Sequence, residues 1–242
     1  MKPTLCILGG CNGAGKSTLA RELLPLLGIR RFLNADEIAK GLSPVDLSIA
    51  AFKAGRLLIE EARELIAADS SFAIESTLNG RTYLSMIREA KERGYLFVLH
   101  DIMIDSGSQA VNRVALRVTH GGHHVPEADV RRRFDRSRKH FVEDYVSLAD
   151  EWVLWDNSEP PHRQIANDTS HRIEDLHDLM NTNRLMEQPV VTGTHEMVRL
   201  GLEASRIATE KMLDFYRRMD IRVTPQMTLA EPETQQKPLI YR

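Results

Sequence analysis

Short apolar runs alternate with longer amphipathic segments along the first two thirds of the chain. The apolar runs have the length and the residue types of buried strands, and they cover residues 4–10, 30–36, 72–76, 95–104 and 150–158. Between them, apolar side chains recur at helical spacing over residues 16–27, 46–68 and 82–94. Strands that alternate with helices predict an α/β fold whose mainly parallel sheet is covered by helices on both faces.

The last part of the chain has a different pattern. Residues 194–219 form one more amphipathic helical segment, and residues 224–242 are rich in Pro, Gln, Thr and Glu, which is typical of disorder. We therefore expect one domain over residues 1–188, a helical extension over 189–222 and a disordered tail over 223–242.

Composition and charge are those of an ordinary soluble protein. The chain has 242 residues and a formal net charge of -2, whereas a dedicated nucleic-acid-binding protein is usually more basic. No apolar run reaches the roughly 20 residues that span a bilayer, and the apolar start of the chain is too short for a signal peptide. Cys6 and Cys11 offer neither a disulfide framework nor zinc-ligand spacing. We expect a cytoplasmic protein without membrane contact.

The segment GGCNGAGKST, residues 9–18, fits the P-loop pattern G-x-x-x-x-G-K-S. It stands between a predicted strand and a predicted helix, which is the context that this motif requires. Glycines let backbone N–H groups turn toward phosphate oxygens, while Lys16 reaches the β- and γ-phosphates and the Ser17 hydroxyl binds Mg²⁺. The sequence therefore predicts that ATP and Mg²⁺ are bound by Gly10, Asn12, Gly13, Ala14, Gly15, Lys16, Ser17 and Thr18.

Phosphoryl transfer also needs a carboxylate beside the acceptor hydroxyl. Asp36 follows the second predicted strand, at the sheet edge where ligands of open α/β folds bind, and it can orient or deprotonate an acceptor there. A helix N-cap is an alternative role for Asp36, and in isolation it is the commoner one. A magnesium-binding acid usually ends an apolar strand; Asp101 interrupts the fourth apolar run and Asp105 closes it, and neither is a compelling candidate.

Glu75 ends the third predicted strand. A carboxylate in that position costs free energy unless it is paired or hydrogen-bonded, so a role in a site is plausible. Thr77 and Arg81 follow within reach of the same sheet edge. Turn and capping roles for Ser76, Thr77 and Asn79 explain these polar residues equally well.

A basic stretch at about residues 109–140 predicts a lid. Arg113 and Arg117 share one face of a predicted helix, which ends at the glycine pair 121–122, and Pro126 starts the next helix. Arginines are dense on that second helix from Arg131 onward. Closing such a lid would bring guanidinium groups to the transferring phosphate and exclude water.

Two other interpretations of this stretch are weaker. Proteins that bind single-stranded nucleic acid stack its bases on aromatic side chains interleaved with basic ones. Phe134 is the only aromatic residue among these arginines. A metal site at His120, His123 and His124 would lack further ligands at suitable spacing, so we expect hinge or surface positions for these histidines.

Five segments together resemble the zeta toxin family of P-loop kinases, in particular its short, stand-alone bacterial members. They are GGCNGAGKST, FLNADEIAKGLSP, FAIESTLNGR, RVALRVTHGGHHVPEADVRRRF and DEWVLWDNS. The resemblance covers about residues 3–175 and implies a three-layer fold related to nucleoside monophosphate kinases, with an arginine-rich helical lid. It also implies ATP-dependent 3'-phosphorylation of UDP-N-acetylglucosamine, and an antitoxin-like protein as a partner.

The resemblance assigns roles to individual residues. The catalytic aspartate of the family corresponds to Asp36, and its substrate-contacting Glu-x-Thr corresponds to Glu75 and Thr77. The phosphate-contacting arginines of its lid correspond to Arg117 and Arg131. By similarity to nucleotide kinases, the adenosine would lie near Arg113, Asp156 and Asn157.

We therefore expect a kinase with an alcohol group of a small molecule, such as a UDP-sugar, as acceptor. In this interpretation Lys16 holds the phosphates, Asp36 acts as the base, and the lid arginines stabilise the transferring group. Three alternatives stay open: a kinase for another metabolite or an antibiotic hydroxyl, a nucleotide-dependent switch that acts through a partner, and a polynucleotide kinase. The last would need a nucleic-acid partner, which the net charge disfavours.

Overall fold

The computed structural model describes residues 2–119, 122, 124–159 and 162–181. The expected helical extension (189–222) and tail (223–242) lie outside the described residues, as do His120, His123 and the end of the expected 1–188 domain.

A single six-stranded sheet forms the centre of the described structure. Its strands lie in the order β2-β3-β1-β4-β5-β6, and the first five are parallel while β6 is antiparallel to β5. The strands cover β1 (Thr4–Gly9), β2 (Arg31–Leu33), β3 (Phe72–Glu75), β4 (Leu96–Met103), β5 (Glu151–Asp156) and β6 (Arg163–Asn167). The expectation of a mainly parallel sheet is confirmed.

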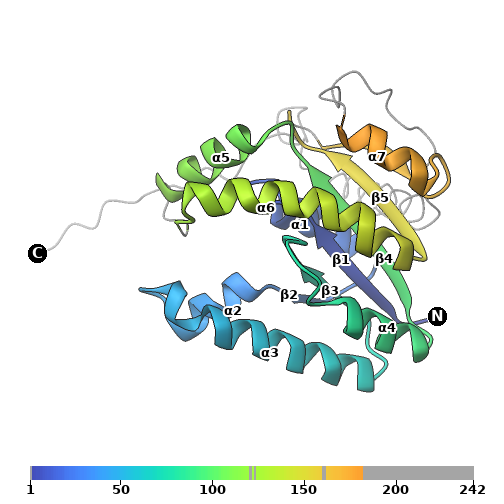
Figure 1. Ribbon diagram of the computed structural model, residues 1–242. Helices are drawn as coiled ribbons and strands as arrows, with labels where there is room; N and C mark the ends of the chain where they lie inside the picture. Colours follow the sequence, from blue (N-terminus) through green and yellow to red (C-terminus); the bar gives the residue numbers. More distant parts are fainter. Residues whose placement is uncertain (1, 120–121, 123, 160–161, 182–242) are drawn as a thin grey trace, which may run out of the picture.

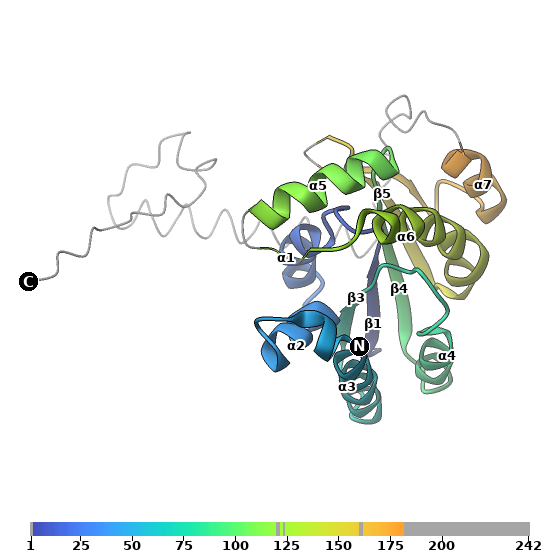
Figure 2. The same ribbon diagram turned by 60° about the vertical axis from the view of Figure 1, so that its left-hand side comes forward.

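Helices cover both faces of this sheet, which gives three layers (Figures 1 and 2). The side chains of β1 alternate: Leu5 and Ile7 pack with α3, α4 and α7 on one face, and Cys6 and Leu8 pack with α1, α5 and α6 on the other. The helices cover α1 (Lys16–Leu26), α2 (Ala35–Leu42), α3 (Leu47–Ala67), α4 (Leu84–Glu92), α5 (Gly107–Thr119), α6 (Glu127–His140) and α7 (Ile173–Asn181). A π-helical turn (Phe141–Tyr145) and a 3-10 turn (Val146–Leu148) lead from α6 to β5.

Two elements, β6 and α7, were not expected from the sequence, and α2 was expected only in the alternative that gave Asp36 a capping role. The helix α2 has only eight residues, and the Asn34 side chain caps it by accepting hydrogen bonds from the backbone N–H groups of Asp36 (2.8 Å) and Glu37 (3.4 Å). The capping role considered for Asp36 is therefore wrong, because Asn34 occupies the cap position. The carboxyl group of Asp36 is not used in the cap.

The described part of the chain contains no helix that is both long enough and apolar enough to cross a lipid bilayer.

Candidate functional site

The P-loop lies between the end of β1 and the start of α1, as the sequence predicts. Gly10, Gly13 and Gly15 all have positive φ angles, of 132°, 79° and 96°. At Gly15 a side chain would also collide with the amide of Asn157, so both the backbone conformation and the close approach require glycine. The loop therefore has the shape in which successive N–H groups can face one anion.

Two side chains expected near the adenosine hold this loop in place. The Asn157 side-chain amide donates to the Ala14 carbonyl oxygen over 2.8 Å. The Arg113 guanidinium donates to the carbonyl oxygens of Gly13 (3.4 Å) and Ser158 (2.9 Å), which links the loop to the segment after β5. Both residues thus lie beside the phosphate-binding loop.

Asp156, expected in the same region, is buried and has a supporting position. Its carboxylate accepts hydrogen bonds from the backbone N–H and hydroxyl of Ser158 and from Arg163. Burial alone would raise the pKa of this carboxyl, but the hydrogen bonds from Ser158 and Arg163 hold it below its ordinary value. Asp156 therefore fixes the segment that carries Asn157 and Ser158.

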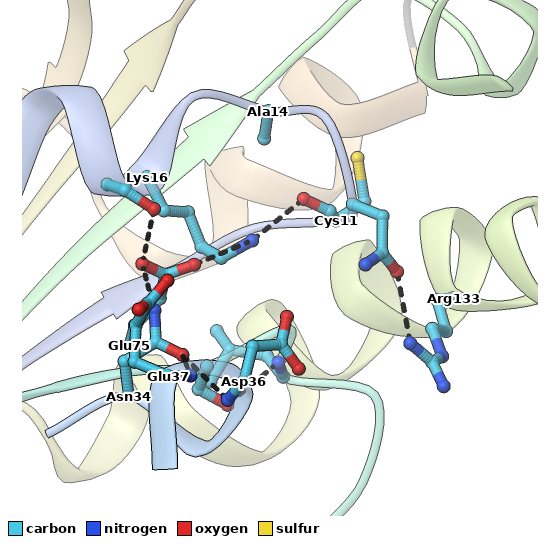
Figure 3. A network of polar contacts seen from close by, with 12 residues as sticks. Cys11, Ala14, Lys16, Asn34, Asp36, Glu37, Glu75 and Arg133 are labelled. Carbon is cyan, nitrogen blue, oxygen red and sulfur yellow. Dashed lines mark hydrogen bonds and ion pairs between the residues drawn. The ribbon is translucent and has the colours of Figure 1, made fainter. Parts of the chain in front are cut away.

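Glu75 is the centre of a polar network below the P-loop (Figure 3). Its carboxylate accepts hydrogen bonds from the Ser17 hydroxyl (2.7 Å) and the Asn34 amide (3.0 Å), and it lies 3.8 Å from the Lys16 ammonium. Lys16 also donates to the Cys11 carbonyl oxygen over 2.9 Å and is only 6% exposed. The end of β3 therefore faces the lysine and the serine of the P-loop directly. These hydrogen bonds and the nearby ammonium group offset the cost of placing the Glu75 carboxylate at the end of a strand.

The residues at this point suit a magnesium ion. Mg²⁺ prefers oxygen ligands, keeps several of its waters and is usually bound by one or two protein oxygens together with substrate phosphates. The Ser17 hydroxyl and the Glu75 carboxylate provide such oxygens side by side. Over residues 2–119, 122, 124–159 and 162–181 no cluster of three or more His, Cys, Asp or Glu side chains could hold a metal without a substrate. His124, which is described, belongs to no such cluster.

A cavity of about 380 Å³ opens in front of this network. The P-loop, α2, α3, the segment after β3 and the two lid helices all contribute to its walls. Its lining includes Asn12, Gly13, Lys16, Asn34, Asp36, Ala51, Gly55, Glu75, Thr77, Tyr83, Arg117 and Arg133. The cavity therefore brings together the phosphate-binding loop, two carboxylates from α2 and the end of β3, and two arginines from α5 and α6.

Asp36 reaches the cavity from the first turn of α2 and is exposed to solvent. In Figure 3 its side chain points away from Glu75. With its backbone N–H bound to Asn34 and its carboxylate outside the Glu75 network, Asp36 is oriented by the helix start and can contact a molecule in the cavity. This is the position that a general base for an acceptor hydroxyl needs.

The lid arginines divide into those that line the cavity and those that do not. Arg117 lines it, and so does Arg133, whose guanidinium donates to the side-chain oxygen of Asn12 over 3.3 Å. The Nε of Arg133 is buried and has no hydrogen-bond partner among the described residues. Arg131 instead binds Glu127 (2.8 Å) and the Ser108 hydroxyl (3.3 Å), outside the cavity.

Two residues that the sequence placed at the phosphates or the substrate do not line this cavity. Arg131 binds Glu127, one turn earlier on α6, whereas Arg133, two residues further along the helix, lines the cavity. Arg81, expected at the substrate, lies in a separate hollow, where it binds Asp144 over 3.0 Å. The hydrogen bond and the charge of Asp144 raise the pKa of Arg81.

Thr77 lines the cavity, and Thr18 is exposed in the first turn of α1. Asn34, which the sequence did not single out, is the link between Glu75 and α2. Its position before an Asp-Glu pair, with the helix start that this pair indicates, is the signal that could have identified it.

No family model matches the chain. An uncharacterized protein of Haemophilus influenzae is 33% identical over 125 residues, which are 52% of this chain and 88% of that protein. A solved structure from the PezAT chromosomal toxin-antitoxin system of Streptococcus pneumoniae is similar with a TM-score of 0.55 and 14% identity, over 88% of each chain. The AvrRxo1-ORF1:-ORF2 structure with ATP is similar with a TM-score of 0.59 and 19% identity, over 80% of this chain and 66% of that chain. These similarities show a shared fold, and they confirm that the fold resembles that of the zeta toxins.

Proposed function

Since the chain belongs to the same family as the uncharacterized Haemophilus influenzae protein and has a zeta-toxin-like P-loop kinase fold, we propose that it is an ATP-dependent phosphotransferase. It transfers the γ-phosphoryl group to a hydroxyl of a small acceptor. Mg²⁺ would be held by Ser17, with Glu75 beside it, and would neutralise the phosphate charge that develops during transfer.

The observation that carries this proposal is the shared cavity of Lys16, Asp36, Arg117 and Arg133. A P-loop alone is common to kinases, switches and motors, but an exposed carboxylate across the same cavity is what an acceptor hydroxyl requires. In this proposal Lys16 holds the phosphates, Asp36 orients and deprotonates the hydroxyl, and the two arginines stabilise the transferring group.

A UDP-N-acetyl sugar is the first acceptor to test, because the motifs resemble those of the zeta toxins. The decisive experiment is mass spectrometry of products after incubation with ATP, Mg²⁺ and a pool of metabolites that includes UDP-N-acetylglucosamine. We expect a product heavier by one phosphoryl group with the wild type and none with Lys16→Ala. If the wild type phosphorylates no component, while ATP is consumed equally with and without the pool, the proposal is wrong.

Asp36→Asn separates binding from transfer. The amide preserves the shape of the side chain but cannot accept the hydroxyl proton, so we expect unchanged ATP affinity and a transfer rate reduced by roughly 10²–10⁴-fold. Glu37→Gln is the matched control, because Glu37 is the neighbouring exposed acid and does not line this cavity. Full transfer activity in Asp36→Asn would exclude Asp36 as the base.

A regulatory protein partner is the second function to consider. Two of the similar structures come from a toxin-antitoxin system and from a pair of ORF products, which favours an antitoxin-like partner for this chain as well. A switch that acts through such a partner would hydrolyse ATP at a rate that no small acceptor changes. The acceptor pool therefore distinguishes the two functions in one experiment.

A further inference from the structure

Asp101 lies in the middle of β4 and has no role in the phosphoryl transfer described above. It is 1% exposed, and it stands opposite Gly9, the last residue of β1, in the register of the parallel pair. The P-loop begins at the next residue. Asp101 is therefore a buried carboxyl group directly beside the point where the chain leaves the sheet to surround the phosphates.

The chain leaves room for this carboxyl group. A Cβ atom on Gly9 would lie 2.5 Å from the Asp101 Oδ1 atom and 2.5 Å from a methyl group of Leu78, so a larger residue at position 9 would force one of these side chains to shift. The Oδ1 atom itself is buried and accepts no hydrogen bond from any residue that the structure describes. A buried carboxylate with an unsatisfied oxygen is costly, whereas the protonated acid is tolerated much better.

The charged groups that face Asp101 come from the two neighbouring elements. Lys16 is part of the P-loop and Arg138 is part of α6. Burial raises the pKa of Asp101 to about 7, although the positive charges of Lys16 and Arg138 act in the opposite direction. Burial also raises the pKa of the Cys11 thiol to about 11, so this neighbour is uncharged near neutral pH.

Arg138 is partly buried and lines a small hollow together with the same carboxyl group. Burial lowers the pKa of Arg138, and the charges of Asp101, Asp135 and Asp105 raise it again. A hollow of about 10 Å³ is lined by Asp101, Arg138 and Cys11, which is close to the space that one water needs. The hollow therefore offers space for about one water beside the Asp101 carboxyl group.

We propose that Asp101 is a positioning residue that takes up a proton from solvent when the phosphates of a nucleotide bind at the P-loop, so that nucleotide affinity depends on its charge. The phosphates bring negative charge to Lys16, which is the cation that Asp101 also faces. A second negative charge on Asp101 is then unfavourable, and the neutral acid is preferred. This inference rests on the proposed binding of ATP at the P-loop, not on the identity of the acceptor.

Linkage fixes the direction of the effect. If nucleotide binding raises the proton affinity of Asp101, protonation of Asp101 must raise the nucleotide affinity by the same factor. ATP should therefore bind more weakly as the pH rises through the interval above about 7. Each unit by which bound phosphates raise the pKa corresponds to about a tenfold loss of affinity between the low and high ends of that interval.

The test is calorimetric titration of MgATP between pH 6 and pH 9, in buffers with different heats of ionisation, which counts the protons taken up on binding. We expect net proton uptake near pH 7–8 in the wild type. In Asp101→Asn this uptake and the associated fall in affinity disappear, because the amide does not titrate. The ionisation of ATP itself is common to both proteins and cancels in the comparison.

Two further variants keep the test decisive. Arg138→Met removes a positive charge that faces Asp101, so we expect the interval of proton uptake to move to higher pH. Asp105→Asn is the control: it removes an exposed carboxylate near Arg138 and should leave the proton uptake of the wild type unchanged.

The outcomes separate this inference from the proposed function. Equal proton uptake and equal pH dependence in wild type and Asp101→Asn would refute the role of Asp101 while ATP binding stands. If Asp101→Asn does not fold, an unshifted interval in Arg138→Met has the same meaning. If the folded wild type binds no MgATP at any pH, both the proposed function and this inference fail.

Discussion

Two carboxyl groups flank the strand that leads into the P-loop, and their surroundings are opposite. Glu75 ends β3 opposite Leu8, and Asp101 lies in β4 opposite Gly9, so they are only one residue apart in the register of the sheet. Glu75 receives hydrogen bonds from Ser17 and Asn34 and borders the open cavity. Asp101 is enclosed, and one of its oxygens has no partner among the described residues.

The contrast shows that position relative to the sheet edge decides what an acid can do. At the end of a strand, helix and loop residues supply donors, and a carboxylate can work with a metal or a substrate. Within a buried strand most neighbours are apolar side chains, which donate no hydrogen bonds to a carboxylate. The carboxyl group is then stabilised by binding a proton. The lysine of the P-loop faces both acids, so each can be tested through its effect on Lys16.

The largest effect is expected from Lys16→Ala. It removes the cation that both acids face and that holds the β- and γ-phosphates, so we expect phosphoryl transfer to fall by more than about 10³-fold. The measurement is the rate of ADP formation with the identified acceptor. If this variant retained more than a tenth of the wild-type rate, Lys16 would not be the cation that holds the phosphates, and neither acid could act through it.

Glu75→Gln tests the acid at the open edge. The amide keeps the size of the side chain but removes the charge beside Ser17 and Lys16, so we expect the transfer rate to fall by roughly 10²–10³-fold. Part of this loss should be recovered at high Mg²⁺ concentration, because a weakened metal site is filled by mass action. The rate is therefore measured as a function of Mg²⁺, with Glu37→Gln as the control that should resemble the wild type. A loss that no Mg²⁺ concentration alters would argue that Glu75 positions the loop rather than the metal.

The residues at the edge of the sheet that borders the cavity could largely be predicted from the sequence. The P-loop has a fixed spacing and strands have recognisable apolar patterns, so Lys16, Ser17 and Glu75 could be placed at one sheet edge without coordinates. The capping of α2 could not be predicted in the same way, because Asn34 and Asp36 are both favourable caps and only the backbone geometry decides between them.

Side-chain direction on a densely charged helix is harder to predict. Arg131 and Arg133 belong to one run of arginines, and local spacing gives no reason to choose between them. The choice depends on how α6 is rotated against α5 and the P-loop, which tertiary packing determines. The buried state of Asp101 has the same origin, since its neighbours Lys16 and Arg138 are distant in the sequence.

Asp101→Asn tests the enclosed acid through stability. The pKa of Asp101 is 3.8 in the unfolded chain and about 7 in the folded protein. Between these two pH values, Asp101 carries a proton in the folded protein but not in the unfolded chain. Stability of the wild type therefore falls as the pH rises through this interval, and it stays at the lower level above it. Asparagine removes this dependence, so the variant should gain about 3 kcal/mol relative to the wild type between pH 5 and pH 8.

Denaturant unfolding of both proteins at several pH values measures this gain. An unsatisfied buried amide costs the same free energy at every pH, so the change in stability with pH, and not the absolute stability, is the informative quantity. A stability difference that does not change between pH 5 and pH 8 would show that Asp101 titrates as an ordinary carboxyl group.

The smallest effect on the transfer rate is expected from a substitution on α6. This helix carries Arg138, which faces Asp101, and Arg133, which lines the cavity that Glu75 borders. Arg133→Met keeps the aliphatic part of the side chain but removes the guanidinium that binds Asn12, so we expect a 10–10²-fold lower transfer rate with little change in stability. Arg131→Met is the matched control, because Arg131 lies on the same helix and binds only exposed partners outside the cavity. If the control loses as much activity as Arg133→Met, lining the cavity does not decide which lid arginine stabilises the transferring group, and this assignment is wrong.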